Sequence, residues 1–174
     1  ARQWLSLDDP GIFPALEKAD ELGLPVCINV HANEAELPQV HAVLRRFPTL
    51  RLVLDHLGRV KIGDGAPYDK ARPLFEMAKY PNFYLKLTPR LLEDVAAEGS
   101  RATADTILPR LVAEFGADRI AFGSNYPSSP GTLPELVGAM VAALQCLGEA
   151  DRQAILSGTA KALYPALART PQPA

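Results

Sequence analysis

The sequence lacks the features that define several common classes of protein. It has only two cysteines, Cys27 and Cys146, in 174 residues, too few for the disulfide framework of a small secreted domain. No apolar run reaches the roughly 18–20 residues that a membrane-spanning helix needs. The first residues do not form the basic and then apolar segments of a secretory signal. We therefore expect a reduced, cytoplasmic protein without membrane contact, in which Cys27 is a small buried residue.

The charge balance and the motifs exclude further classes. A net charge of −2 offers no general attraction to nucleic acid. No Gly-x-Gly-x-x-Gly or Walker motif follows an apolar run, so a dinucleotide-binding or P-loop fold loses its main support. With 48% hydrophobic and 22% charged residues, the chain has the composition of a globular domain with a sizeable core. This composition is compatible with a small-molecule partner.

Apolar runs alternate with helical periodicity along the chain. Four short runs predict strands that are buried on both faces, at 25–30, 51–55, 83–87 and 119–123. Periodic apolar residues predict helices at about 10–22, 36–47, 68–80, 105–115, 132–145, 149–156 and 159–167. In the helix at 105–115, Pro109 is compatible only with the first turn. Strands that alternate with helices in this way predict right-handed parallel βαβ units and an α/β fold.

Polar side chains stand where the predicted strands end. His31 follows the first strand, His56 the second and Asn125 the fourth, while Lys86 lies between two leucines of the third. Alternation along the strands predicts that these four side chains point to the inner face of the sheet and that Asp55 faces the helix layer. Because the carboxyl ends of parallel strands meet at one edge, we expect a site there.

Four segments carry a resemblance to a known family. VHAN follows the first predicted strand, DHLG follows the second, YLKLT lies on the third, and FGADRIAFGSNYP surrounds the fourth. Their order and spacing resemble the last four strands of the amidohydrolase-related barrel family, and ILSGTAKALYPAL resembles its terminal helix. That family includes sugar-lactone and pyrone-dicarboxylate lactonases and some decarboxylases. The resemblance covers roughly residues 4–167.

The resemblance implies a specific part of a barrel. The chain would hold strands five to eight, the C-terminal half of a TIM-like (β/α)8 barrel. Such barrels have eight strands and typically ~250 residues, so we expect the 174 residues to be a fragment or half of an assembly. Residues 1–167 would form the partial barrel domain and residues 168–174 a frayed tail. An N-terminal half-barrel or a second chain would cover the two open sheet edges.

The resemblance also implies roles for the residues at the strand ends. His31 matches a metal ligand of the metal-dependent members, which implies one divalent metal, zinc or manganese. The His-x-His pair that such enzymes use at their first strand does not occur in this sequence. His56 matches a histidine that contacts substrate or activates water. Asn125 stands where many members have an aspartate, and an amide is neither a base nor a good metal ligand.

Other residues are candidates for binding the substrate. If Asn125 is catalytic, we expect it to position water or a carbonyl while His56 acts as the base. Lys86 and Arg59 are candidates for binding a substrate carboxylate, and Asn33 and Tyr126 are further substrate-binding candidates. The alternatives are that Arg59 is a solvated loop charge and that Tyr126 fills the core.

Three functions follow from this reading of the sequence. The first is hydrolysis of an ester-like C–O bond, in a lactone with an acidic or sugar-like substituent, with His56 managing the proton and Lys86 holding the anionic end. The second is metal-dependent, non-oxidative decarboxylation of an aromatic or pyrone acid. The third is a non-catalytic half-barrel that binds a ligand or a partner, which the missing His-x-His pair and Asn125 both favour.

Overall fold

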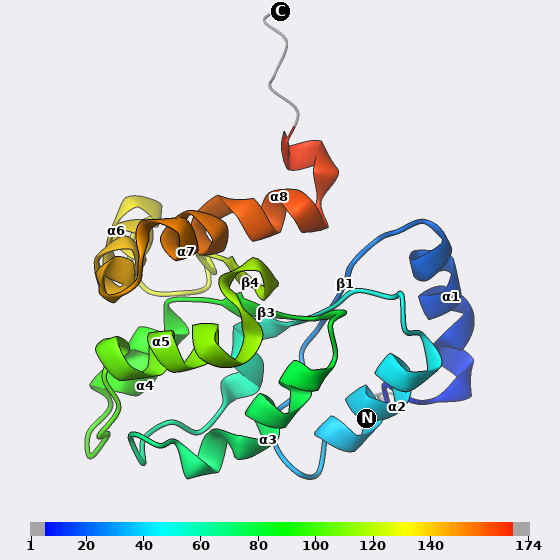
Figure 1. Cartoon of the computed structure of the whole chain (residues 1–174), viewed down its shortest axis with the longest axis horizontal. Helices are drawn as coiled ribbons and strands as arrows, with labels where there is room; N and C mark the ends of the chain where they lie inside the picture. Colours follow the sequence, from blue (N-terminus) through cyan, green and yellow to red (C-terminus); the bar gives the residue numbers. More distant parts are fainter. Residues whose placement is uncertain (1–5, 169–174) are drawn as a thin grey trace, which may run out of the picture.

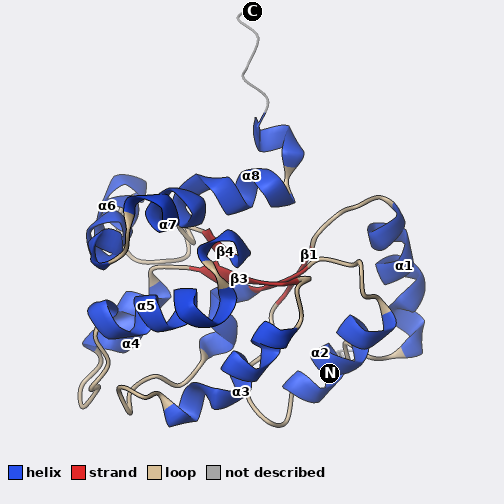
Figure 2. Cartoon of the chain, in the orientation of Figure 1, coloured by secondary structure: helices blue, strands red, loops and turns tan. Residues whose placement is uncertain are grey.

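A four-stranded parallel sheet forms the centre of the part of the chain that the structure, a computed structural model, describes, residues 6–168. The strands are β1 (Val26–Ile28), β2 (Leu52–Leu54), β3 (Phe83–Leu87) and β4 (Ile120–Phe122). They pair in the order β1-β2-β3-β4, so neighbours in sequence are neighbours in space. Figure 2 shows the sheet between layers of helix. The predicted parallel α/β arrangement is therefore confirmed. Apart from Ala168, the predicted tail lies outside the described residues.

Helices connect the strands and flank the sheet. They are α1 (Phe13–Glu21), α2 (Leu37–Arg46), α3 (Arg72–Phe75), α4 (Arg90–Ala96), α5 (Ala104–Phe115), α6 (Leu133–Ala143), α7 (Glu149–Gln153) and α8 (Thr159–Leu163). Short 3-10 segments extend several of them, and a π-helical segment, Ala154–Gly158, joins α7 to α8. Figure 1 shows α2, α3, α4 and α5 on one side of the sheet and α6, α7 and α8 on the other. Within residues 6–168, no helix is long and apolar enough to cross a membrane.

Two helices differ from the sequence predictions. α4 forms in the stretch 89–102, where the pattern predicts no regular element, and it begins directly after Pro89, a residue whose fixed φ suits a helix start. Pro109 lies inside α5, past the first turn. The helix continues through it because Leu108 and Leu111 on either side are each only 1% exposed. Tertiary burial therefore outweighs the local cost of the proline.

The two faces of the sheet are covered differently. On the outer face, Leu54 and Leu85 are fully buried in the main core. On the inner face, Val53 packs with Leu163 of α8 in a separate small cluster. Cys27, on the same inner face of β1, is exposed and not buried as predicted, because β1 lies at the edge of the sheet.

Candidate functional site

A left-handed turn ends β2 and presents the first histidine of the site. Residues 56–59 all have positive φ, between 50° and 61°. Left-handed backbone costs a non-glycine residue about 1–2 kcal/mol, and strain of this kind concentrates at functional sites. The Gly58 carbonyl accepts a hydrogen bond from the Ala32 amide at 2.7 Å, which ties the turn to the loop after β1. The sequence prediction grouped His56 with Leu54 on the inner face, but Leu54 lies in the outer core. The left-handed turn therefore brings His56 away from the face of Leu54.

Asp55 joins His56 to Lys86 at the carboxyl ends of β2 and β3. Lys86 Nζ lies 2.9 Å from Asp55 Oδ1 as an ion pair, although without the geometry of a hydrogen bond. His56 Nε2 lies 3.3 Å from Asp55 Oδ2, and His56 Nδ1 lies 2.9 Å from the Thr88 hydroxyl oxygen. The Asp55 and His56 side chains are 18% and 13% exposed. Partial burial reduces the screening of these contacts by water.

The orientation of Asp55 corrects the sequence prediction, which turned it toward the helix layer. Val53 pairs with Tyr84 across β2 and β3. Val53 and Asp55 therefore lie on the inner face that also carries Tyr84 and Lys86. Strand alternation in FYLKL indicates this face for Lys86, but only the register between the two strands assigns the same face to Asp55.

A glycine of the neighbouring strand gives the Lys86 side chain its space. Ala121 pairs with Lys86 across β3 and β4, and Gly123 follows two residues later on the same face. A Cβ atom at Gly123 would lie 2.6 Å from Lys86 Cε, closer than two carbon atoms approach. The small residues on the inner face of β4 therefore leave the lysine stem room to reach Asp55.

Burial favours the neutral form of the His56 ring. Burial is the largest cause that lowers the pKa of His56, the Asp55 carboxylate raises it, and the cations Lys86, Arg59 and Arg90 lower it further. The ordinary pKa of histidine is about 6.5, so the imidazole is mainly uncharged at neutral pH. A neutral imidazole offers one N–H donor and one acceptor nitrogen.

A basic groove opens beside His56. It has a volume of about 530 Å³, and the side chains that line it include His31, Arg59, Lys61, Lys70, Arg90, Asp94 and Glu98. Within residues 6–168, none of its four Lys and Arg side chains forms an ion pair. Arg90 Nε is buried without a hydrogen-bond partner among these residues. The four cationic side chains outnumber the two carboxylates of the lining, Asp94 and Glu98, so the groove favours an anionic ligand.

His31 lies on the wall of this groove. Its Nδ1 is 2.6 Å from Glu36 Oε1, and the other oxygen of Glu36 accepts the His31 amide at 2.9 Å. These two contacts fix the ring, whose side chain is 49% exposed. Among the residues that the structure describes, no hydrogen bond or ion pair joins His31 to His56.

Three further predicted residues contact their own loops. Asn125 has a φ of 54°, and its Nδ2 donates to Ser129 Oγ at 2.9 Å. The side-chain oxygen of Asn33 accepts two backbone amides in the turn before α2. Tyr126 is 55% exposed. Within the described range, no hydrogen bond or ion pair joins these residues to the His56 ring.

Sequence reasoning missed four residues with a place at this site. Asp55 and Thr88 contact His56, Glu36 holds His31, and Arg90 lines the basic groove. The signal for Asp55 was its position directly before His56, at the end of an apolar strand.

The donor groups of the chain do not form a metal centre on their own. Across residues 6–168, no three His, Cys, Asp or Glu side chains gather where they could hold a metal ion, whereas protein zinc sites use three or four ligands. His31 could supply one ligand. Both nitrogens of His56 face other groups, and the Asn125 amide contacts Ser129. The residues present therefore do not fit a complete zinc or manganese site.

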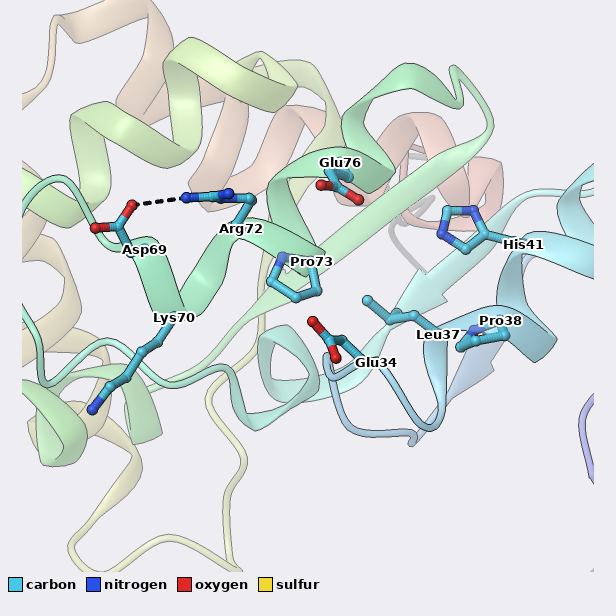
Figure 3. A pocket seen from close by; sticks show the side chains of 9 residues that line it. All are labelled: Glu34, Leu37, Pro38, His41, Asp69, Lys70, Arg72, Pro73 and Glu76. Carbon is cyan, nitrogen blue, oxygen red and sulfur yellow. Dashed lines mark hydrogen bonds and ion pairs between the residues drawn. The ribbon is translucent and has the colours of Figure 1, made fainter.

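A second groove lies away from this cluster, between α2 and α3. It has a volume of about 450 Å³, and Figure 3 shows Glu34, His41 and Glu76 among the side chains around it. His41 Nδ1 is 3.0 Å from the Tyr80 hydroxyl. Neither Lys86 nor any residue of the turn after β2 lines this groove.

The comparisons with known proteins agree with the fold. The model of the amidohydrolase family matches residues 2–166. An L-fucono-1,5-lactonase from Burkholderia ambifaria is 28% identical over 123 residues, which cover 71% of this chain and 41% of the lactonase. The chain therefore spans about two fifths of the length of this curated relative.

Solved structures share the architecture at lower identity. A protein from Pseudomonas putida described as a 2-pyrone-4,6-dicarboxylic acid hydrolase has a TM-score of 0.75 at 23% identity, covering 94% of this chain and 60% of its own. An amidohydrolase from Burkholderia multivorans with bound zinc has a TM-score of 0.74 at 23% identity, and the match covers 91% of this chain and 58% of the amidohydrolase. Dihydroxybenzoate decarboxylases share the fold with TM-scores of 0.62 and 0.60, and one of them holds manganese. The partial coverage is that of a half-barrel.

Proposed function

The chain belongs to the amidohydrolase family, and we propose that it forms the C-terminal half of a barrel hydrolase that opens a lactone with an acidic or sugar-like substituent. The observation that carries this proposal is the contact of Lys86 and His56 with Asp55 at the carboxyl ends of β2 and β3. Barrel enzymes build their active sites at this end of the strands. The name of the lactonase relative supports the same reaction class.

In the proposed reaction, water adds to the ring carbonyl and the ring C–O bond breaks, which gives a hydroxy acid. Negative charge develops on the carbonyl oxygen, and fixed donors that face this oxygen lower the barrier. Lys86 supplies a positive charge near the strand ends, and His56 supplies a neutral imidazole. Asn125 is proposed to orient water or a carbonyl, since an amide carries no usable basicity. His31 on the groove wall is proposed as one ligand for a metal.

The rest of the barrel is proposed to close the sheet. In the strand order β1-β2-β3-β4, the strands β1 and β4 each have one neighbour among the described residues. A closed barrel of this kind has eight strands, and the chain covers 58% and 60% of the two solved structures named above. We therefore propose that four further strands, on an N-terminal half-barrel or a second chain, pair with both edges. This association is tested by comparing the native mass of the protein in solution with the mass of one chain.

The basic groove is proposed to bind the acidic substituent, with Arg59 and Arg90 as its guanidinium groups. We expect Arg90→Gln to raise the KM for 2-pyrone-4,6-dicarboxylate roughly ten- to hundredfold with little change in kcat, because a charge-assisted hydrogen bond contributes about 1.5–3 kcal/mol. The KM for the uncharged L-fucono-1,5-lactone should stay the same. Steady-state kinetics with both lactones checks this prediction.

A matched control for this change is Arg110→Gln, because Arg110 lies on α5 and pairs with Glu114. It should leave both KM values within about twofold of wild type, since it removes only a partly exposed ion pair and a contact with the Phe75 ring, both outside the proposed site. Equal losses on the charged and the uncharged lactone after Arg90→Gln would contradict an anion-binding role.

Decarboxylation is the second candidate, because decarboxylases share the fold. Analysis of the products separates the two reactions. Each lactone and 2,6-dihydroxybenzoate are incubated separately with the protein. Ring opening is detected as the release of a proton, and decarboxylation is detected by trapping carbon dioxide. The proposal expects an opened ring and a proton. Carbon dioxide from the aromatic acid, with both lactones intact, would replace it with decarboxylation. Binding without any turnover would favour the non-catalytic module.

A further inference from the structure

Two side chains face the nitrogens of the His56 ring. The Thr88 hydroxyl oxygen lies 2.9 Å from Nδ1, and Asp55 Oδ2 lies 3.3 Å from Nε2. An ionised carboxylate only accepts hydrogen bonds, whereas a hydroxyl can donate or accept. A lone pair on Nε2 would be repelled by the carboxylate oxygen, while a proton on Nε2 is attracted to it. The Thr88 hydroxyl, in a residue only 1% exposed, is then free to donate to Nδ1.

The second oxygen of Asp55 holds the lysine. Lys86 Nζ is 2.9 Å from Oδ1, which is buried and forms no hydrogen bond among the described residues. Asp55 is the one carboxylate that pairs with Lys86 within that range. One carboxylate therefore fixes the position of both the lysine ammonium and the imidazole. Because Oδ1 is shielded from solvent, this oxygen is placed to orient the Lys86 ammonium.

We propose that Asp55 and Thr88 are positioning residues, which fix neutral His56 as its Nε2–H tautomer and hold the Lys86 ammonium beside that proton. The consequence for catalysis rests on the hydrolysis proposed above. His56 then offers a proton and not a lone pair on the side of Lys86. The Nε2 contact with Asp55 is an ion-pair distance of 3.3 Å without the geometry of a hydrogen bond, so the Nε2–H remains able to donate to the carbonyl oxygen as negative charge develops, as neutral imidazoles act in other enzymes. Over the whole reaction, the attacking water gives one hydrogen to the ring oxygen that leaves and the other to solvent when the product acid ionises. His56 Nε2 accepts neither, in contrast to the base role that the resemblance implies.

The charges around His56 determine how a change at Asp55 acts. Four charged groups face the ring: Asp55 at the end of β2, Arg59 in the turn, Lys86 on β3 and Arg90 on α4. Of these only Asp55 is an anion, and it raises the pKa that burial lowers. Asp55→Asn removes this anion, so the pKa of His56 falls further. The amide nitrogen of the new side chain can also donate to Nε2, which favours the Nδ1–H tautomer.

Nitrogen NMR of the chain labelled at histidine tests the proposal without any substrate. The sequence contains three histidines, so His56→Gln assigns the signal of His56. We expect the Nε2–H tautomer in the wild type, and in Asp55→Asn a lower pKa together with a larger Nδ1–H fraction. Asp69→Asn is the matched control, because Asp69 is a carboxylate that is 69% exposed and pairs with Arg72. It should leave the His56 signals unchanged.

Variants of Thr88 give a second, independent readout if Asp55→Asn does not fold. Thr88→Val keeps the shape of the buried side chain and removes the hydroxyl, so the Nδ1 signal of His56 should shift toward that of a nitrogen without a hydrogen bond. Thr88→Ser should restore the wild-type signal. A wild-type His56 in the Nδ1–H form, or a tautomer and pKa unaffected by Asp55→Asn in the folded chain, would overturn the proposal. Because no lactone is present, these results stand apart from the outcome of the turnover assay.

Discussion

Replacement of His56 by Gln is expected to lower lactone turnover roughly 100- to 1,000-fold, the contribution of one fixed hydrogen-bond donor to the carbonyl oxygen. The physical reason is its place at the end of β2, where Asp55 Oδ2 and the Thr88 hydroxyl face its two nitrogens. Gln keeps an N–H donor but cannot reproduce the ring geometry that aims this donor. The measurement is kcat and kcat/KM of the complete enzyme with L-fucono-1,5-lactone, beside the unfolding midpoint of each variant.

The matched control is His41→Gln. His41 lines the groove between α2 and α3 and contacts Tyr80, away from the strand ends. Turnover should stay within about twofold, since the substitution changes a side chain with no place in the proposed site. If His56→Gln also keeps turnover within a few-fold of wild type while it remains folded, His56 has no part in the mechanism.

The pH profile should follow the neutral form of His56. Burial lowers its pKa from the ordinary value of 6.5. The charged form is therefore disfavoured in the folded protein, and the fraction of neutral rings is already high at pH 7. Activity that needs the neutral ring is lost as the pH falls through this lowered pKa.

Gly58→Ala is expected to destabilise the fold by about 2–5 kcal/mol, the sum of about 1–2 for left-handed backbone and about 1–3 for overpacking. Gly58 has a φ of +61°, and a Cβ atom there would lie 2.8 Å from the Ala32 amide nitrogen and 2.9 Å from Leu54 Cδ2. The Ala32 amide is also the donor to the Gly58 carbonyl, so any shift weakens the hydrogen bond that fixes the turn. Urea unfolding measures the change in free energy.

Gly99→Ala separates the two contributions to this cost. Gly99 has a φ of +74°, and a Cβ atom there would meet no atom within 4 Å. This variant should therefore lose only about 1–2 kcal/mol, the cost of the left-handed backbone. If both substitutions cost the same, the close approach of Gly58 to the loop after β1 does not contribute, and the turn is held by other contacts.

Much of the fold could be predicted because each strand is marked within a few residues. FYLKL predicts a strand at 83–87, and β3 has these bounds. Helical spacing between the runs predicts the crossover connections of a parallel sheet, and the strand order confirms them. α4 could not be predicted in the same way. Pro89, Gly99 and Ser100 mark a loop locally, whereas burial of Leu91 to 4% exposure helps to hold the helix.

The site was harder to predict, because alternation holds only inside a strand. β2 ends at Leu54, and the residues that follow Asp55 adopt left-handed backbone. Extrapolation of the strand pattern past this point gives the wrong face for Asp55. Arg90 and Thr88 lie after β3, and their relation to His56 depends on packing between β2 and β3. Information of this kind is long-range and does not appear in local spacing.

The most direct test of the proposed site is a crystal structure of the complete enzyme with a ring-opened acid or an inert lactone analogue bound. We expect the carbonyl or carboxylate oxygen from the ring to lie within hydrogen-bond distance of Lys86 Nζ or His56 Nε2. An acidic substituent should then lie against Arg59 and Arg90 in the basic groove. A ligand in the groove between α2 and α3, or one that contacts neither Lys86 nor His56, would contradict the account.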